Sequence, residues 1–204
     1  MNEAAPRRQP HSLNELSPLP YLLFFCNFAS HYQGRKWDHC FSHHYLGYSR
    51  PVGEHLKYLI LAGERPVACL AWSSAPLQLD LRDQFVGAPR AAYRHNLPQI
   101  AYNSRYLILP WVKVPHLASH LLGRIVRRIS ADWQELYHHP IQLLESFVDI
   151  ERFRGTCYRA ANWILLGRSK GRGTKSKYGQ PDCSIKELWV YPLGKNFRQR
   201  LLAP

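Results

Sequence analysis

The order strand, helix, strand in the middle of the chain constrains the fold more than any other feature. Residues 104–112 form the strongest strand pattern and run into Pro115, a natural first-turn residue, and an amphipathic helix to about Tyr137. A continuous apolar strand follows over 141–148. Because a strand–helix–strand crossover joins neighbouring strands of one sheet, the pattern predicts a mixed α/β fold. The apolar stripe of the helix consists of Leu117, Leu121, Leu122, Ile125, Ile129 and Trp133.

The remaining elements are predicted from local signals on both sides of this unit. After a flexible arm at 1–18, helical patterns cover about 19–30 and 35–46, followed by β-rich runs at 55–61 and 66–72 that a tight turn joins into a hairpin. A single domain is expected over 19–204. Its further elements are a helix around 88–97, a short helix from 155, a strand at 163–166 and a last strand at 185–191.

The charge of the chain favours a polyanionic partner. It holds 27 Lys and Arg against 14 Asp and Glu, a net charge of +13, with eleven histidines in addition. Such an excess is evidence about partners rather than about fold. It leaves open a basic protein that is merely soluble.

The cysteines and the N-terminus indicate a reducing compartment. Five cysteines form no CxxC pair, and their odd number argues against a secreted disulfide framework. The polar, proline-rich N-terminus has no apolar signal core, and the run 21–25 is too short to span a bilayer. A cytoplasmic, nucleoid-associated protein without a membrane partner is expected.

Two acids close the apolar strand and are candidates for a catalytic role. Glu145 and Asp149 lie four residues apart, roughly 13 Å on a strand, which is too far for one shared metal. Either could act as a general base near an amine substrate. Alternatively, Asp149 caps the next helix or turn and Glu145 pairs with an arginine.

No metal site is predicted. His116 and His120 have the spacing of one helical turn, but no third ligand is evident nearby, so solvated or hydrogen-bonded histidines are the favoured interpretation. The sequence has no P-loop, no nucleophile elbow and no nucleotide-binding glycine pattern.

A basic loop between the last two strands is the best candidate for nucleic-acid contact. Its glycines allow the backbone to approach phosphates, and five cations would neutralise them. The alternative is a loop that only solvates the protein. The predicted contacts are Arg168, Lys170, Arg172, Lys175 and Lys177, extended by Arg124, Arg127 and Arg128 on the long helix.

The element order resembles the GNAT N-acetyltransferase fold. The turn before the long helix, KVPHLA, is similar to the pyrophosphate turn of that family but has His116 at the middle glycine. The resemblance implies acetyl-CoA or a related acyl-CoA held by Lys113, His116, Ala118 and Ser119. The stretch YRAANW is similar to the family's tyrosine motif, with Asn162 in place of its glycine, which implies Tyr158 as a general acid.

Longer phrases resemble the DruA-like family. They are HHYLGY, NSRYLILPWVKVPHLASHLLG, FVDIERFRGTCYRAANW and WVYPL. The resemblance implies an anti-phage or mobile-element setting, with a transposase, nuclease or helicase as candidate partner. A DNA-interacting module on a GNAT-like scaffold is therefore expected. The alternatives are an acyl-CoA-dependent transferase acting on a nucleobase or protein amine, and a DNA strand-transfer protein.

Overall fold

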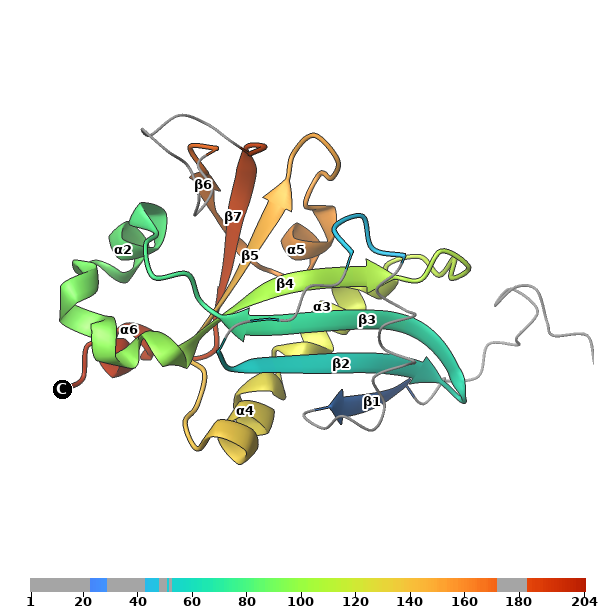
Figure 1. Ribbon diagram of the computed structural model, residues 1–204, viewed down its shortest axis with the longest axis horizontal. Coiled ribbons are helices and arrows are strands. Elements are labelled where there is room, and N and C mark those ends of the chain that lie inside the picture. Colours follow the sequence, from blue (N-terminus) through green and yellow to red (C-terminus); the bar gives the residue numbers. More distant parts are fainter. Residues whose placement is uncertain (1–22, 29–42, 48–50, 52, 172–182) are drawn as a thin grey trace, which may run out of the picture.

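The fold is built on one mixed sheet of seven strands (Figure 1). The computed structural model describes residues 23–28, 43–47, 51, 53–171 and 183–204. The strand order is β1-β2-β3-β4-β5-β7-β6, and only the central pair, β4 and β5, is parallel. The predicted mixed α/β class is thus confirmed. The strands are β1 Leu23–Phe28, β2 His55–Ala62, β3 Arg65–Ser74, β4 Ile100–Ile108, β5 Leu143–Asp149, β6 Ile164–Arg168 and β7 Lys186–Pro192.

Helices cover both faces of this sheet. Neighbouring residues of β4, Ile100 and Ala101, belong to two different buried clusters, which places the clusters on opposite faces because strand side chains alternate. Among the described residues, none of the helices has the length and apolar character needed to cross a membrane. The helices are α2 Asp80–Val86, η3 Arg90–Gln99, α3 Leu117–Ile125, α4 Ile129–Tyr137, α5 Thr156–Ala160 and α6 Phe197–Leu201.

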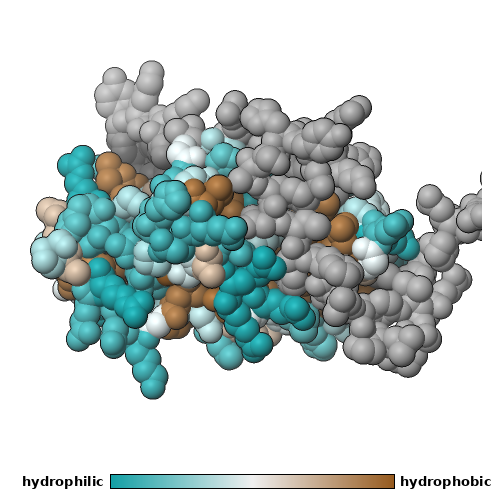
Figure 2. Space-filling model, turned by 90° about the horizontal axis from the view of Figure 1, so that it is seen from below, coloured by the Kyte–Doolittle hydropathy of each residue, from teal (hydrophilic) through white to brown (hydrophobic). Residues whose placement is uncertain are grey.

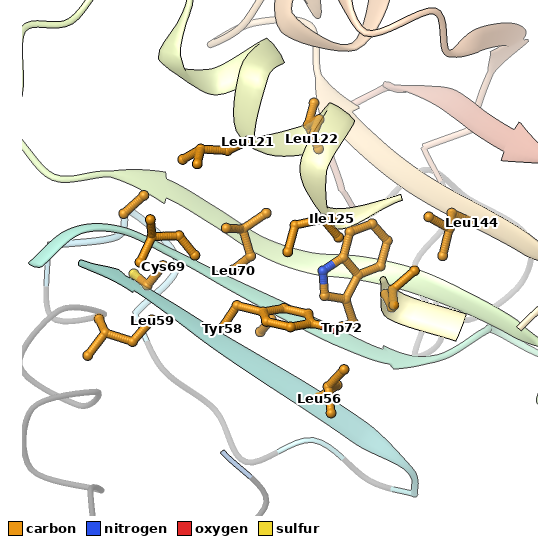
Figure 3. Packing of buried hydrophobic residues seen from close by; sticks show 14 of the residues in the cluster. Leu56, Tyr58, Leu59, Cys69, Leu70, Trp72, Leu121, Leu122, Ile125 and Leu144 are labelled. Atoms are coloured by element: carbon orange, nitrogen blue, oxygen red, sulfur yellow. The ribbon is translucent and has the colours of Figure 1, made fainter. Parts of the chain in front are cut away.

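The larger cluster includes buried residues of α3 and α4, and Figure 3 shows the part of it that lies under α3. Leu121, Leu122 and Ile125 of α3 belong to the same cluster as Leu70 and Trp72 of β3, which are fully buried. All six residues of the predicted apolar stripe are buried, so the 3.6-residue period correctly identified the core face of the helix.

The hairpin was predicted correctly, but three other elements differ from the prediction. Residues 23–28 form a strand paired with β2, so the helix expected over 19–30 is wrong. The expected single helix to Tyr137 is two helices, broken where Arg128 takes a non-helical conformation. The central strand runs over 100–108 rather than 104–112. The arm at 1–18 and most of the helix expected over 35–46 lie outside the described residues.

The parallel strands β4 and β5 diverge at their carboxyl ends. They pair only from Ile100 opposite Leu143 to Asn103 opposite Ser146, although β4 continues to Ile108 and β5 to Asp149. Figure 1 shows the two strands separating, with α5 near the wider end. A register shift in the β3–β4 pairing lies beside Asn103. We call the opening between β4 and β5 beyond Asn103 and Ser146 the strand splay. It positions the candidate site.

Candidate functional site

Tyr158 of α5 links the two strands where the splay begins. The Ser146 hydroxyl donates a hydrogen bond to the Tyr158 oxygen at 2.7 Å, and the Tyr158 hydroxyl donates to Asn103 Oδ1 at 3.0 Å. Asn103 Nδ2 in turn donates to the carbonyl oxygens of Ala71 and Arg105. Every member of this buried network therefore has a partner, which fixes the position of the tyrosine hydroxyl. Neither Asn103 nor Ser146 was predicted as a site residue.

Burial keeps the Tyr158 hydroxyl protonated. Its pKa is raised, first by desolvation and then by the nearby Cys157, and only the hydrogen bond from Ser146 opposes this. Tyr158 is 7% exposed. The protonated form is the one a general acid needs. In this structure, its proton is donated to Asn103.

Aromatic rings surround Tyr158 on the same face of the sheet. Trp163 meets its ring edge-on at 5.2 Å, and Trp189 stacks on it at 6.2 Å. Trp163 also stacks on Trp72 at 6.2 Å. Gly155, at φ 64°, begins α5 with a backbone conformation that favours glycine and brings the chain against the Trp189 ring.

Glu145 lies on the opposite face of the sheet from Tyr158. It is fully buried, and both of its carboxylate oxygens are 3.4 Å from Nη1 of Arg82, which is also fully buried. Arg82 further donates to the carbonyl oxygens of Pro76 and Leu77 and to the Tyr93 hydroxyl. The structure therefore does not bring Glu145 and Tyr158 together, and it gives Glu145 the arginine partner considered as the alternative.

Asp149 ends β5 and holds the turn that follows. One carboxylate oxygen accepts from the Glu151 amide at 3.1 Å, and the other accepts from the Ser184 hydroxyl at 3.0 Å. Arg152 lies 3.8 Å away. This is the capping arrangement that the sequence offered as the alternative to a general base.

The turn before α3 places His116 in a backbone conformation that favours glycine. His116, the residue preceding α3, lies at φ 58° and ψ 6°, in the left-handed region. Lys113 and His116 are exposed, and Ala118 and Ser119 are half-buried. The Ser119 hydroxyl donates to the His116 carbonyl at 3.0 Å, and the Tyr106 hydroxyl donates to the Ala118 carbonyl at 2.6 Å. The Leu117 amide donates to the Val114 carbonyl at 3.4 Å, which leaves the other first-turn amides of α3 as candidate donors for an anion.

The predicted nucleic-acid contacts fall into two separate groups. Arg168 and Lys170 lie at and just after the edge strand β6, 3.8 Å from Glu187 and 3.2 Å from Asp80, respectively. Arg172, Lys175 and Lys177 lie outside the described residues. The second group lies at the α3–α4 junction, where Arg128 pairs with Asp132 at 2.7 Å, and Arg124 and Arg127 are exposed. The described cations therefore come from two parts of the fold, the edge strand β6 and the α3–α4 junction.

Residues 43–47 meet the turn after β5, residues 150–154. Together they form a rim of the strand splay, which the sequence did not predict. The Tyr45 ring lies 5.6 Å from the Phe153 ring, and the Arg152 guanidinium lies 4.8 Å from the centre of the Tyr45 ring. Arg105 of β4 donates to the Gly47 carbonyl at 3.0 Å. The phrases HHYLGY and FVDIERFRG contain this rim, but nothing in their spacing showed that they meet.

These features define a mixed α/β domain with a parallel central strand pair that splays around a buried tyrosine. Similar solved structures are acetyltransferases, and the similarity is remote. An N-acetyltransferase from Staphylococcus aureus Mu50 shares 9% identity, with 84% of this chain and 98% of that one covered at a TM-score of 0.49. An acetyltransferase from Salmonella typhimurium that modifies the N-terminal serine of ribosomal protein L7/L12 shares 12% identity at a TM-score of 0.43. The match covers 69% of this chain and 64% of the Salmonella protein.

The chain belongs to the DruA family. The family model described as Druantia protein DruA matches residues 30–180, which include the strand splay, Tyr158 and the rim. A search of curated proteins found no match. The predicted family is therefore confirmed.

Proposed function

We propose that this chain is a DNA-contacting module of an anti-phage defence system. The observation that carries the proposal is an imbalance between inward-facing acids and outward-facing bases. The whole chain carries a net charge of +13. A surface on which most cations are solvent-exposed and many acids are withdrawn attracts phosphate polyanions more strongly than the net charge alone suggests.

The acids are withdrawn because they hold internal contacts. Asp132 accepts from the Tyr58 hydroxyl and pairs with Arg128. Glu54 accepts from the Trp133 indole and from His139. The described carboxylates that are buried or half-buried, each with such a contact, are Glu54, Asp83, Asp132, Glu145, Asp149 and Glu187.

The bases mostly point outward. Arg82 is the fully buried cation among the residues that the structure describes. Seen from below, the described surface is largely hydrophilic (Figure 2). The exposed cations include Lys113, Arg124, Arg127, Arg152, Arg154, Arg159, Arg168, Lys170 and Lys195.

Salt-dependent DNA binding is the expected result. We would titrate single- and double-stranded DNA by gel shift or anisotropy at several salt concentrations. The affinity should fall steeply with salt: in duplex DNA, the logarithm of the binding constant plotted against the logarithm of the salt concentration has a slope near −0.9 for each phosphate bound. Changing Arg168, Lys170 and Arg172 to alanine should reduce that slope by roughly 1 for each phosphate that the variant no longer binds. A charge-matched control changes Arg90, Arg94 and Lys195. Equal weakening by both triple variants would show that only net charge matters, and absence of binding at low salt would refute the proposal.

Acyl-CoA-dependent transfer is a second candidate function, favoured by the turn at 113–119. His116 stands at the position where the similar family motif has glycine, and its backbone takes the left-handed conformation that favours glycine. It directly precedes the nine-residue helix α3. The residues therefore fit a pyrophosphate, with the α3 amides as donors and Lys113 as a neighbouring cation. The bound group would supply an activated acyl thioester, and Tyr158 would keep its proton for the departing thiolate.

Acetyl-CoA is then expected to stabilise the folded chain against heat. A ligand at one hundred times its dissociation constant adds about 2.7 kcal/mol to the free energy of unfolding. His116→Gly should enlarge the thermal shift, because it removes the side chain beside the turn while keeping the backbone conformation. Lys113→Ala should reduce the shift. An unchanged melting temperature at millimolar acetyl-CoA, in both wild type and His116→Gly, would exclude this candidate.

A further inference from the structure

An exposed aromatic group lies at the rim of the strand splay. Phe153 is 50% exposed and Tyr45 is 43% exposed, whereas Tyr158, Trp163 and Trp189 of the same splay are buried. The exposed rings come from segments about a hundred residues apart, and they meet beyond the carboxyl end of β5. In open α/β sheets, ligands bind outside the carboxyl ends of the parallel strands.

The structure holds this rim in place. Tyr45 stacks on His44 with ring centres 4.8 Å apart, and the His44 ring accepts from the Leu46 amide. His43 meets Trp111 edge-on at 5.5 Å, just after β4. The Arg152 guanidinium covers part of the Tyr45 ring, so Phe153 offers the more open aromatic surface of the two. These contacts fix Tyr45, the ring beside Phe153, so the rim loses little freedom when a ligand binds.

The charges around Phe153 are mainly positive. Arg152 and Arg154 flank it in the sequence, both exposed, and Arg105 lies under the rim. The facing acids are the exposed Glu151 and Asp149, which is 6% exposed, bonded to Ser184 and 3.8 Å from Arg152. An aromatic surface next to arginines matches an unpaired nucleobase and its flanking phosphates, because bases stack on rings and arginine neutralises phosphate.

We propose that the rim formed by residues 43–47 and 150–154 binds single-stranded nucleic acid, with one unpaired base stacked on Phe153. Arg152 and Arg154 contact the phosphates on either side of that base. This inference rests on the proposed DNA function and adds to it a place on the molecule and a preference for unpaired bases.

The test measures fluorescence anisotropy with labelled oligothymidylate and with a blunt-ended duplex of the same number of phosphates. Phe153→Ala should weaken oligothymidylate binding about tenfold and leave duplex binding unchanged, since stacking requires an unpaired base. Phe153→Tyr should bind like wild type, and Phe153→Leu should bind like Phe153→Ala, because the ring rather than its apolar character is needed. The matched control is Leu202→Ala, which truncates another exposed apolar side chain, 40% exposed, at the end of α6.

The outcomes separate this inference from the proposed function. Salt-dependent binding that Phe153→Ala leaves unchanged, or weakens equally for duplex and single strand, would overturn the rim assignment while the DNA function stands. Phe153→Leu binding as tightly as wild type would overturn stacking as the mode of contact. Failure of every variant and of wild type to bind either probe at low salt would overturn both.

Discussion

Replacing Arg82 by methionine is expected to lower the free energy of unfolding by about 3–5 kcal/mol, because it leaves Glu145 as an unpaired carboxylate in the core. Arg82 and Glu145 are both fully buried, and Arg82 is the cation that contacts Glu145 among the described residues. Urea denaturation at pH 8, followed by tryptophan fluorescence, measures the loss.

The matched control removes both charges together. The double variant Arg82→Met with Glu145→Leu should recover most of the loss, since a buried ion pair replaced by apolar residues of similar volume is often neutral or stabilising. A double variant no more stable than Arg82→Met alone would mean that the bonds from Arg82 to Pro76, Leu77 and Tyr93 matter more than its pairing with Glu145.

The same pair gives the fold a pH dependence of known sign. Burial raises the pKa of Glu145 from 4.5 to about 7, and the Arg82 charge opposes this. Between these values the folded chain keeps a proton that the unfolded chain releases, so this group lowers the free energy of unfolding as the pH rises. Arg82→Met removes the opposing charge. Its loss of stability should therefore be smaller at pH 5 than at pH 8, and a loss independent of pH would contradict this account.

The sequence predicted the elements whose signals are local. The hairpin at 55–74 follows from two β-rich runs around a glycine turn, and the helix stripe from Leu117 to Trp133 follows from its period. The run 21–25 is apolar at every position, so periodicity could not separate helix from strand, and pairing with β2 decides the outcome.

The candidate site depends on contacts between residues far apart in the sequence. Asn103 reaches Tyr158 over 55 positions, and Arg82 reaches Glu145 over 63. Nothing in the spacing of single residues encodes such meetings. From the sequence, Glu145 could be either a general base or the partner of an arginine. The burial of both Glu145 and Arg82 favours the ion pair.

Gly155→Ala is expected to lower the free energy of unfolding by about 2–4 kcal/mol. About 1–2 kcal/mol comes from placing a side chain in the left-handed region, and the rest from overpacking. An added Cβ would lie 3.0 Å from the Trp189 ring, which stacks on Tyr158, so the change should also disturb the site and its tryptophan fluorescence.

The control is Gly123→Ala within α3, where a Cβ meets nothing within 4 Å. That variant should gain roughly 0.5–1 kcal/mol from helix propensity. Chemical denaturation of the two variants checks the pair. Of the two positions, 155 is the one next to Trp189. Equal changes in the free energy of unfolding for both variants would therefore show that the packing of Gly155 against Trp189 does not hold Tyr158 between β4 and β5.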